Sequence, residues 1–411
     1  MIRILVLLFV LLTPLSLARA DAGAQGRVVI LIAFDGFRPD YLERGVTPNL
    51  SRLARQGISG PMRPAFPSKT FPNHWTLVTG LVPDRHGIVA NRFEDPARPG
   101  ELFTMASDDP FWWNQAEPIW VAAERAGIRT ATMFWPGSNV AWGGTKPAGN
   151  APPTGGQRPA DWQMFNQEVS NTQRVNAVLD WLRRPAAIRP RLVTLYFDTV
   201  DTAGHRFGPD DPRTTAVIAE ADRHMGDLLA GLEELKITAD LVIVADHGMA
   251  AVSSERVIAL DTLADPALYR VLETGPYAAL VPTEGNAEKL RQALAKPGAH
   301  HTCWPREAIP ARLRYGSNPR VAAILCLAEP GWSILPTAPG EAFAGGAHGY
   351  DPAAPDMAAL FIGHGPSFDP GVRLAAFDNV AVTPLLRHLL GLPPAPALDG
   401  TTAPFTRVLR P

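Results

Sequence analysis

The sequence predicts an α/β fold with a mostly parallel central sheet and helices on both of its faces. Short apolar, β-branched runs that end in Asp or Asp-His recur along the chain, and helical stretches separate them. This alternation is typical of parallel sheets, because parallel strands need long crossover connections. The 411 residues are enough for one large domain with insertions or for two domains.

Four runs have the character of buried strands in such a sheet. They are residues 27–34 (RVVILIAF), which end at Asp35, residues 190–201, which run into Asp201, residues 239–248, which contain Asp246 and His247, and residues 356–365. Residues 128–135 predict a further strand. Helices are predicted over residues 47–57, 68–80, 117–127, 211–235 and 378–391, several of them with an N-terminal Thr-Pro or Asp signal or a C-terminal glycine.

Two segments interrupt this pattern. Residues 136–162 are rich in Gly, Pro, Asn and Thr and predict a long loop. Residues 251–343 form a mixed segment, which we interpret as an inserted cap subdomain within a single catalytic domain spanning residues 24–411. It contains both cysteines, Cys303 and Cys326. In an exported protein such a pair favours one disulfide, and two buried free thiols are the alternative.

The N-terminus has the features of an export signal. Residues 1–20 combine an early Arg3, a mostly apolar stretch and an Ala-Arg-Ala end that resembles a cleavage site. The apolar run is too short for a typical membrane span, so we expect a cleaved signal and a periplasmic or secreted protein without a stable membrane span, rather than an anchor. The net charge of −2 gives no electrostatic case for wrapping nucleic acid.

Candidate metal ligands stand where predicted strands end. Ligands of open parallel sheets bind beyond the carboxyl ends of the strands, so Asp35, Asp201, Asp246 and His247 are expected to converge. One strand-end Asp alone is more often a turn or a helix cap. Three such sites with neighbouring histidines favour a binding site.

Two further histidines complete the candidate set. His205 stands four residues after Asp201, a spacing that brings both side chains to one face of a turn, and His348 lies among glycines in GGAHGYDP. Three carboxylates and three imidazoles suit zinc better than manganese or iron, and they are too many for one tetrahedral ion with an open position. We therefore expect two zinc ions, arranged as for an in-line phosphoryl displacement.

Five motifs together resemble the nucleotide pyrophosphatase/phosphodiesterase family of the alkaline phosphatase superfamily. They are AFDGFRPDYL, TFPNHWTLVTGLVPDRHGIVAN, DTVDTAGHRFGP, VADHGM and GAHGYDP, and they cover residues 27–352 in family order. The resemblance implies an alkaline phosphatase-like core. It also implies Thr70 as nucleophile, Asn91 as a donor to a phosphoryl oxygen, and Phe71 and Tyr196 as aromatics that hold a base. By the same resemblance, one ion takes Asp35, Thr70, Asp246 and His247, and the other takes Asp201, His205 and His348.

The implied activity is zinc-dependent hydrolysis of nucleotide phosphodiester and pyrophosphate bonds. Substrates would be ATP, NAD, nucleotide sugars or nitrophenyl nucleotide esters, with a covalent phosphothreonine intermediate and a nucleoside 5'-monophosphate as product. Phosphonoacetate hydrolysis and hydrolysis of choline-type lipid headgroups are alternatives on the same two-metal core. A non-catalytic binding protein is a further alternative, and a missing ligand or nucleophile would favour it. The sequence makes no prediction of oligomeric state.

Some neighbouring residues are expected to be structural. His74 and His86 flank the nucleophile and are interpreted as packed histidines. Lys69, beside Thr70, could meet phosphate, but a structural role is favoured.

Overall fold

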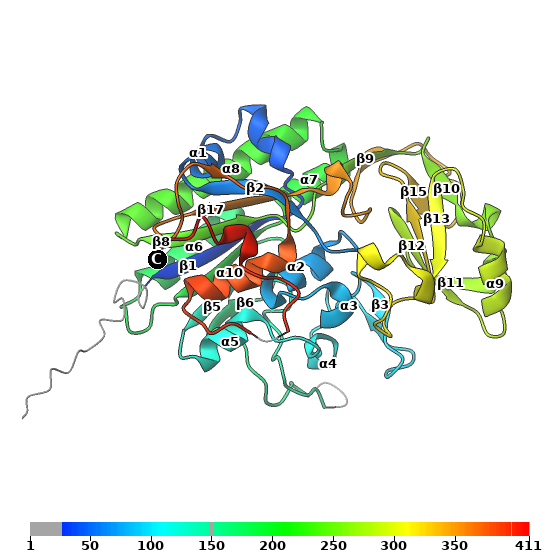
Figure 1. Cartoon of the computed structure of the whole chain (residues 1–411), viewed down its shortest axis with the longest axis horizontal. Coiled ribbons are helices and arrows are strands. Elements are labelled where there is room, and N and C mark those ends of the chain that lie inside the picture. Colours follow the sequence, from blue (N-terminus) through cyan, green and yellow to red (C-terminus); the bar gives the residue numbers. More distant parts are fainter. Residues whose placement is uncertain (1–26, 148–150, 396, 411) are drawn as a thin grey trace, which may run out of the picture.

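A computed structural model describes residues 27–147, 151–395 and 397–410, so the predicted signal peptide lies outside the described residues. The centre of the fold is one large twisted sheet (Figure 1). Its strands follow the order β18 (Val372–Arg373), β2 (Ile58–Arg63), β17 (Ala359–His364), β8 (Ala239–Val244), β1 (Val28–Phe34), β7 (Leu192–Phe197), β5 (Thr130–Met133) and β6 (Asp161–Gln163), with β19 (Phe377–Asp378) also pairing with β2.

The strands from β8 to β6 are all parallel, as the sequence predicts. β17 is the exception, because it runs antiparallel to both β8 and β2. The chain passes His348 shortly before β17, so it enters this strand from the edge where the other strands end. β2 was not predicted, since its sequence ISGPMR lacks an apolar run.

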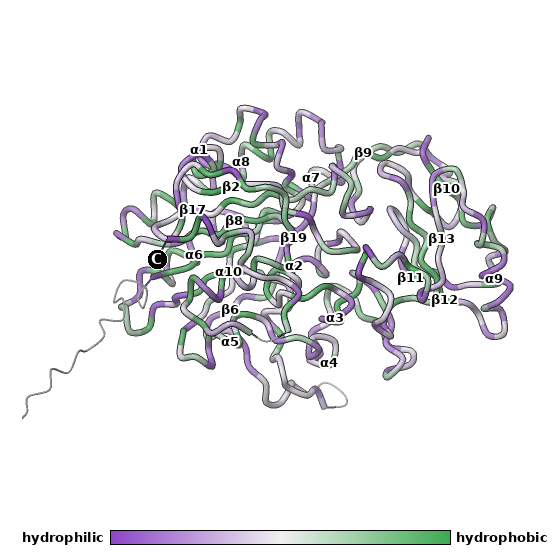
Figure 2. Tube along the Cα trace, in the orientation of Figure 1, coloured by the Kyte–Doolittle hydropathy of each residue, from purple (hydrophilic) through white to green (hydrophobic). Residues whose placement is uncertain are grey.

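Helices cover both faces of the sheet (Figure 1). One group that packs together comprises α1 (Pro48–Gln56), α6 (Asn171–Arg183), α7 (Thr199–Phe207) and α8 (Pro212–Glu234). The other comprises α2 (Thr70–Thr79), α5 (Ile119–Arg125) and α10 (Val382–Leu389). Hydrophobic residues concentrate along the central strands between these layers (Figure 2), and all seven residues of β1 are buried.

Local signals account for where these helices begin and end. Asp211 caps α8 by accepting a hydrogen bond from the Arg213 N–H, and Ser170 forms a capping box with Gln173 at the start of α6. The Gly57 N–H closes α1 by donating to the Leu53 carbonyl. The predicted helix over residues 378–391 begins as a 3-10 turn at Asn379–Ala381 and continues as α10.

The segment after β8 builds a second lobe beside the sheet (Figure 1). Its base is the antiparallel pair of β9 (Ala250–Ser253) and β16 (Ala344–Ala347). Between them lie a four-stranded sheet in the order β11 (Tyr269–Glu273), β12 (Tyr277–Pro282), β14 (Ile324–Ala328) and β13 (His301–Pro305), the pair β10 (Val257–Ala259) and β15 (Ser333–Leu335), and α9 (Ala287–Leu294). Cys303 and Cys326 face each other across β13 and β14 and form a disulfide, which confirms the predicted pairing.

A loop of this lobe is tied to the core beside α2. The contact region comprises α3 (Pro83–His86), β3 (Phe93–Glu94), β4 (Leu102–Phe103) and α4 (Pro110–Trp113). Asp84 accepts hydrogen bonds from the N–H groups of residues 316–318. The buried Arg320 donates to Asp95 at 2.6 Å and to the carbonyls of Gly87 and Trp112. The lobe is therefore anchored by a buried ion pair with satisfied hydrogen bonds.

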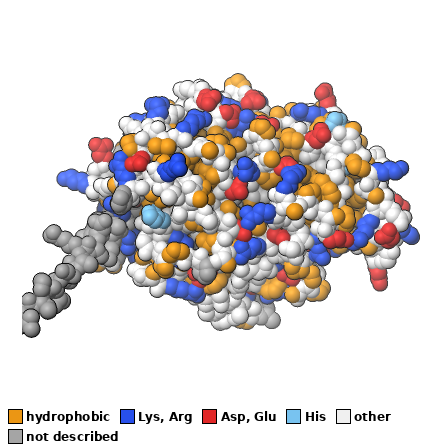
Figure 3. Space-filling view, in the orientation of Figure 1, with side chains coloured by type: hydrophobic (Ala, Val, Ile, Leu, Met, Phe, Trp, Pro, Cys, Tyr) orange, Lys and Arg blue, Asp and Glu red, His pale blue; other side chains and the backbone are white. Residues whose placement is uncertain are grey.

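Surface charge shows no segregation on the viewed face. Basic and acidic side chains are intermingled there (Figure 3). Among the described residues, no helix is both long and apolar enough to cross a membrane.

Candidate active site

The first ligand cluster joins the ends of two neighbouring strands. Asp35 follows β1, and Asp246 and His247 follow β8. The two strands are parallel with Ala33 opposite Val244, so the residues after them emerge at the same edge. All three side chains are buried, and one ligand atom from each lies within 4.8 Å of the others.

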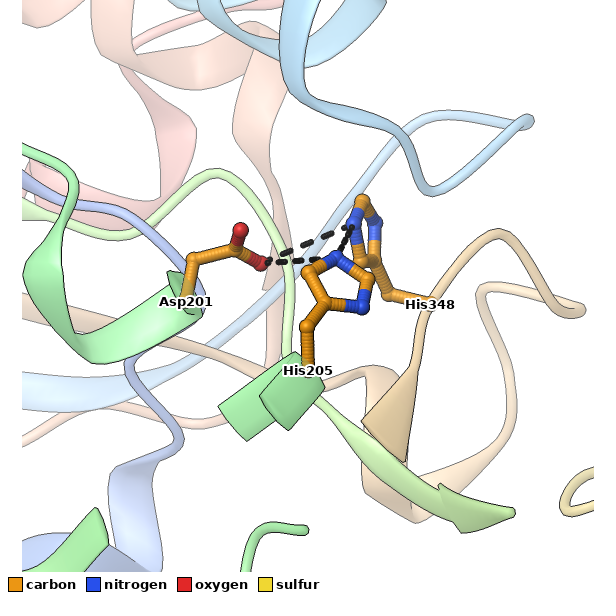
Figure 4. A group of neighbouring side chains, drawn as sticks. All are labelled: Asp201, His205 and His348. Atoms are coloured by element: carbon orange, nitrogen blue, oxygen red, sulfur yellow. Dashed lines mark hydrogen bonds and ion pairs between the residues drawn. The ribbon is translucent and has the colours of Figure 1, made fainter. Parts of the chain in front are cut away.

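The second cluster joins a helix and a loop (Figure 4). Asp201 lies in the first turn of α7 rather than at the end of β7, and His205 is one turn further along the same helix face. His348 follows β16. Its Nε2 lies 3.6 Å from Asp201 Oδ1, and His205 Nε2 lies 3.5 Å from the same oxygen.

The two clusters are neighbours. The rings of His247 and His348 stack at a centroid distance of 3.4 Å. Gly36 makes the approach possible, because its φ is +67° and a Cβ there would lie 3.1 Å from the Asp201 Cα. Its N–H also donates to Asp246 Oδ1 at 3.2 Å. Gly36, the residue after Asp35, thus contacts Asp201 of the second cluster and Asp246 of the first.

Backbone carbonyls orient all three histidines of the candidate clusters. In each ring Nδ1 lies within 2.9 Å of a carbonyl oxygen, that of Gly248 for His247, Gly346 for His205 and Ser68 for His348. A donating Nδ1–H leaves the Nε2 lone pair for a metal ion, a common arrangement around metal sites. His205 Nε2 and His348 Nε2 face each other at 3.0 Å, and two such lone pairs are compatible only with a cation or a proton near both.

The carboxylates also fit a divalent cation. Among the described side chains, Asp35 Oδ1, Asp201 Oδ1 and Asp246 Oδ2 are buried without a hydrogen-bond partner. Burial raises the pKa of Asp35, and the neighbouring Asp246 and Asp201 carboxyls raise it further. Burial also raises the pKa of Asp201 despite the nearby imidazoles of His205 and His247. Cations in this space would satisfy the free oxygens and relieve the repulsion.

Thr70 lies at the first cluster. It is the first residue of α2, and its Oγ1 is 3.3 Å from His247 Nε2. Asn91 lies beside it, because its Oδ1 accepts a hydrogen bond from the Phe71 N–H at 3.1 Å. Since that N–H is engaged and Pro72 has none, the start of the helix offers fewer free amides to a phosphate than its sequence suggests.

The two aromatic residues expected at a base differ in exposure. Phe71 is half-buried, with its ring 6.2 Å from that of Phe103 and 6.0 Å from that of Trp113. Tyr196 is only 7% exposed, and its hydroxyl donates to Asp35 Oδ2 at 2.6 Å. In this position the Tyr196 hydroxyl orients Asp35, a candidate metal ligand, and little of the Tyr196 ring is exposed for contact with a nucleotide base.

Sequence reasoning missed two residues near the site. Phe165 is 47% exposed, and its ring lies 5.9 Å from that of Tyr196. An apolar Met-Phe pair in a polar segment was the available signal. His74 was interpreted as structural, but its Nδ1 lies 3.4 Å from Asp246 Oδ2 as well as 2.9 Å from the Thr70 carbonyl. Burial tends to raise the pKa of Asp246, but the imidazoles of His247 and His74 hold it well below its usual range.

Comparison with known proteins adds independent evidence. Residues 29–351 match the family described as type I phosphodiesterase / nucleotide pyrophosphatase. The chain is 35% identical to human ectonucleotide pyrophosphatase/phosphodiesterase family member 5, with 90% of this chain and 75% of that protein covered. It is 34% identical to the Xenopus laevis bis(5'-adenosyl)-triphosphatase enpp4, with 89% of this chain and 78% of that protein covered.

Solved structures agree with this result. The structure of the human family member 5 superposes with a TM-score of 0.87 at 34% identity, covering 94% of this chain and all of that one. A murine family member 5, solved as an inactive threonine-to-alanine variant in complex with AMP, gives a TM-score of 0.86 at 33% identity, with 93% of this chain and all of that one covered. The likeness confirms the predicted alkaline phosphatase-like α/β fold.

Proposed function

Because this chain is an enzyme of the type I phosphodiesterase/nucleotide pyrophosphatase family, which is metal-dependent, we propose that it hydrolyses nucleotide diesters with two zinc ions and a threonine nucleophile. The observation that carries this proposal is the adjacency of two three-ligand clusters with Thr70 Oγ1 at one of them. The related bis(5'-adenosyl)-triphosphatase and the AMP complex of the murine relative support a nucleotide substrate.

Each cluster would hold one cation. Asp35, Asp246 and His247, together with Thr70, would hold the first, and Asp201, His205 and His348 the second. When bound, zinc would supply Lewis-acid charge and lower the pKa of a coordinated hydroxyl or water. Carboxylate and imidazole donors in these numbers suit zinc.

Thr70, Asn91 and His348 would have distinct roles in the reaction. Thr70 Oγ1 would attack phosphorus and form the phosphothreonine intermediate, while the leaving group departs on the side of the second cluster. Asn91 would donate from its amide to a non-bridging phosphoryl oxygen, since its Oδ1 is held by the Phe71 N–H. Burial lowers the pKa of His348 well below its ordinary value, with a contribution from His247, which keeps this imidazole neutral and able to bind metal.

The base would lie between Phe71 and the exposed aromatic at position 165. We assign this wall to Phe165 rather than to Tyr196, because Phe165 is exposed, whereas Tyr196 is buried and its hydroxyl donates to Asp35. Stacking of a base on an aromatic ring contributes about 1–3 kcal/mol. We also propose export to the periplasm or the medium, on the basis of the predicted signal at residues 1–20.

A comparison of rates tests the proposal. The purified protein with added zinc should hydrolyse ATP and a nitrophenyl nucleotide ester faster than glycerophosphocholine, phosphonoacetate or a phosphomonoester. Thr70→Ala should lose the activity while still binding zinc, and Thr70→Ser should keep part of it. Preference for glycerophosphocholine or phosphonoacetate would replace the nucleotide assignment. A fully active Thr70→Ala protein would exclude the nucleophile.

A further inference from the structure

A lysine and a glutamate from different lobes meet beside the second ligand cluster. Lys69 comes from the core, directly before Thr70, and Glu273 is the last residue of β11 in the inserted lobe. Both side chains are largely buried, and Lys69 is 9% exposed. The pair therefore lies at the boundary between the start of α2 and the inserted lobe.

The pair is open rather than closed. Lys69 Nζ lies 3.9 Å from Glu273 Oε1, whereas an ammonium–carboxylate hydrogen bond measures about 2.7–2.9 Å. Within the described residues, Glu273 Oε2 is buried and has no hydrogen-bond partner. The Lys69 ammonium also lies 5.8 Å from the centre of the Tyr277 ring. A buried cation with free donors is costly unless a second anion completes its surroundings.

The lysine stem directs this charge toward the second cluster. Its Cε would lie 2.8 Å from a Cβ at Gly349, so it passes against the residue that follows His348. The lysine is thus on the side from which the leaving group departs in the proposed reaction.

We propose that Lys69 and Glu273 form a leaving-group subsite, in which Lys69 binds a leaving group that is itself a phosphate anion. This inference rests on the proposed function. As Thr70 Oγ1 loses its proton to water and bonds to phosphorus, the bond from phosphorus to the bridging oxygen breaks and its electron pair moves onto the departing phosphate. Lys69 stabilises that negative charge, and Glu273 is its counter-charge when the subsite is empty.

Opposite effects are expected from removing the two charges. The measured quantity is the ratio of kcat/KM for ATP, which releases pyrophosphate, to kcat/KM for a nitrophenyl nucleotide ester, which releases nitrophenolate. Lys69→Met should lower this ratio about 10- to 100-fold, the loss expected for a charge-assisted hydrogen bond. Glu273→Gln should raise it several-fold, because a negative charge near the departing phosphate is removed. Lys289→Met on α9 of the inserted lobe is a matched control that should leave the ratio unchanged.

The outcomes separate this inference from the proposed function. A wild-type protein that hydrolyses neither nucleotide contradicts the proposed function itself. A wild-type protein that hydrolyses both, with a ratio unchanged within about twofold in Lys69→Met, overturns the subsite alone. A fall of the ratio in Glu273→Gln also overturns it, because the pair would then act as a latch between the lobes. Thermal unfolding of each variant shows whether it is folded, and Glu273→Gln keeps the test decisive if Lys69→Met does not fold.

Discussion

Removing the hydroxyl of Tyr196 should weaken metal binding without much effect on nucleotide affinity. In Tyr196→Phe the ring and its contacts with Phe165 and His74 remain, and only the hydrogen bond to Asp35 Oδ2 is lost. Asp35 Oδ1 already has no hydrogen-bond partner among the described residues, so the variant leaves both oxygens of this carboxylate without a hydrogen-bond donor. The side chain of one metal-ligand candidate is then held less firmly.

The size of the effect follows from two independent considerations. A hydrogen bond to a charged group contributes about 1.5–3 kcal/mol, and the distance of 2.6 Å in this structure is that of a strong one. Loss of a partner that orients a metal ligand typically lowers metal affinity about 10- to 100-fold. The two figures agree, since a tenfold change corresponds to about 1.4 kcal/mol.

The assay is a zinc titration of chelator-treated protein, read as hydrolysis of a nitrophenyl nucleotide ester. Half-maximal activity should require about 10- to 100-fold more free zinc in Tyr196→Phe, whereas KM at saturating zinc should stay within about twofold. Tyr315→Phe is a matched control, because that buried hydroxyl donates to the Val89 carbonyl away from both clusters. Superimposable zinc titrations of wild type and Tyr196→Phe would refute the assigned role of the hydroxyl. A raised KM at saturating zinc would instead indicate that Tyr196 contacts the nucleotide base.

Three further changes test other parts of the structure. His86 is fully buried, and burial lowers its pKa from 6.5 to about 3. The unfolded chain therefore binds the proton more readily, and the free energy of unfolding decreases as the pH is lowered. Urea unfolding should show a loss of about 2 kcal/mol from pH 7 to pH 5 that is absent in His86→Gln. Phe165→Ala should raise KM for a nucleotide ester about tenfold relative to bis(nitrophenyl) phosphate, which lacks a base. Arg320→Met should lower the free energy of unfolding by about 3–5 kcal/mol, because Asp95 is left buried and unpaired.

Each of these has a contradicting result. An unchanged acid dependence in His86→Gln would assign the loss of stability to other groups. Equal KM changes for both esters would exclude base stacking at Phe165. If the double variant Arg320→Met with Asp95→Asn is as unstable as Arg320→Met alone, the cost does not come from the unpaired Asp95 charge.

Local pattern predicted the central strands of the sheet and the candidate ligands near their ends, but it did not predict β2. β1, β7 and β8 are apolar runs long enough to identify, and parallel pairing then brings the residues after β1 and β8 to one edge. The spacing of Asp201 and His205 predicted a shared face, and it holds because both lie on α7. The direction of β17 could not be predicted in this way, because it depends on where the chain leaves the insertion.

Contacts between residues far apart in the chain remained beyond the sequence. Nothing near Tyr196 in the sequence indicates that its hydroxyl reaches Asp35, and nothing near Phe165 indicates that its ring makes an edge contact with Tyr196. The meeting of Lys69 with Glu273 likewise depends on how the inserted lobe docks on the core.

The sequence by itself predicted the fold class from hydrophobic periodicity and most of the candidate metal ligands from strand-end chemistry, because both are readable from short stretches of chain, whereas Thr70 as nucleophile and the division of the ligands between two ions came from the family resemblance. The tertiary structure decided which side chains contact those candidate ligands and which aromatic rings stay exposed beside them, because hydrogen bonds and ring contacts depend on positions that only the packed core brings within a few ångströms of each other.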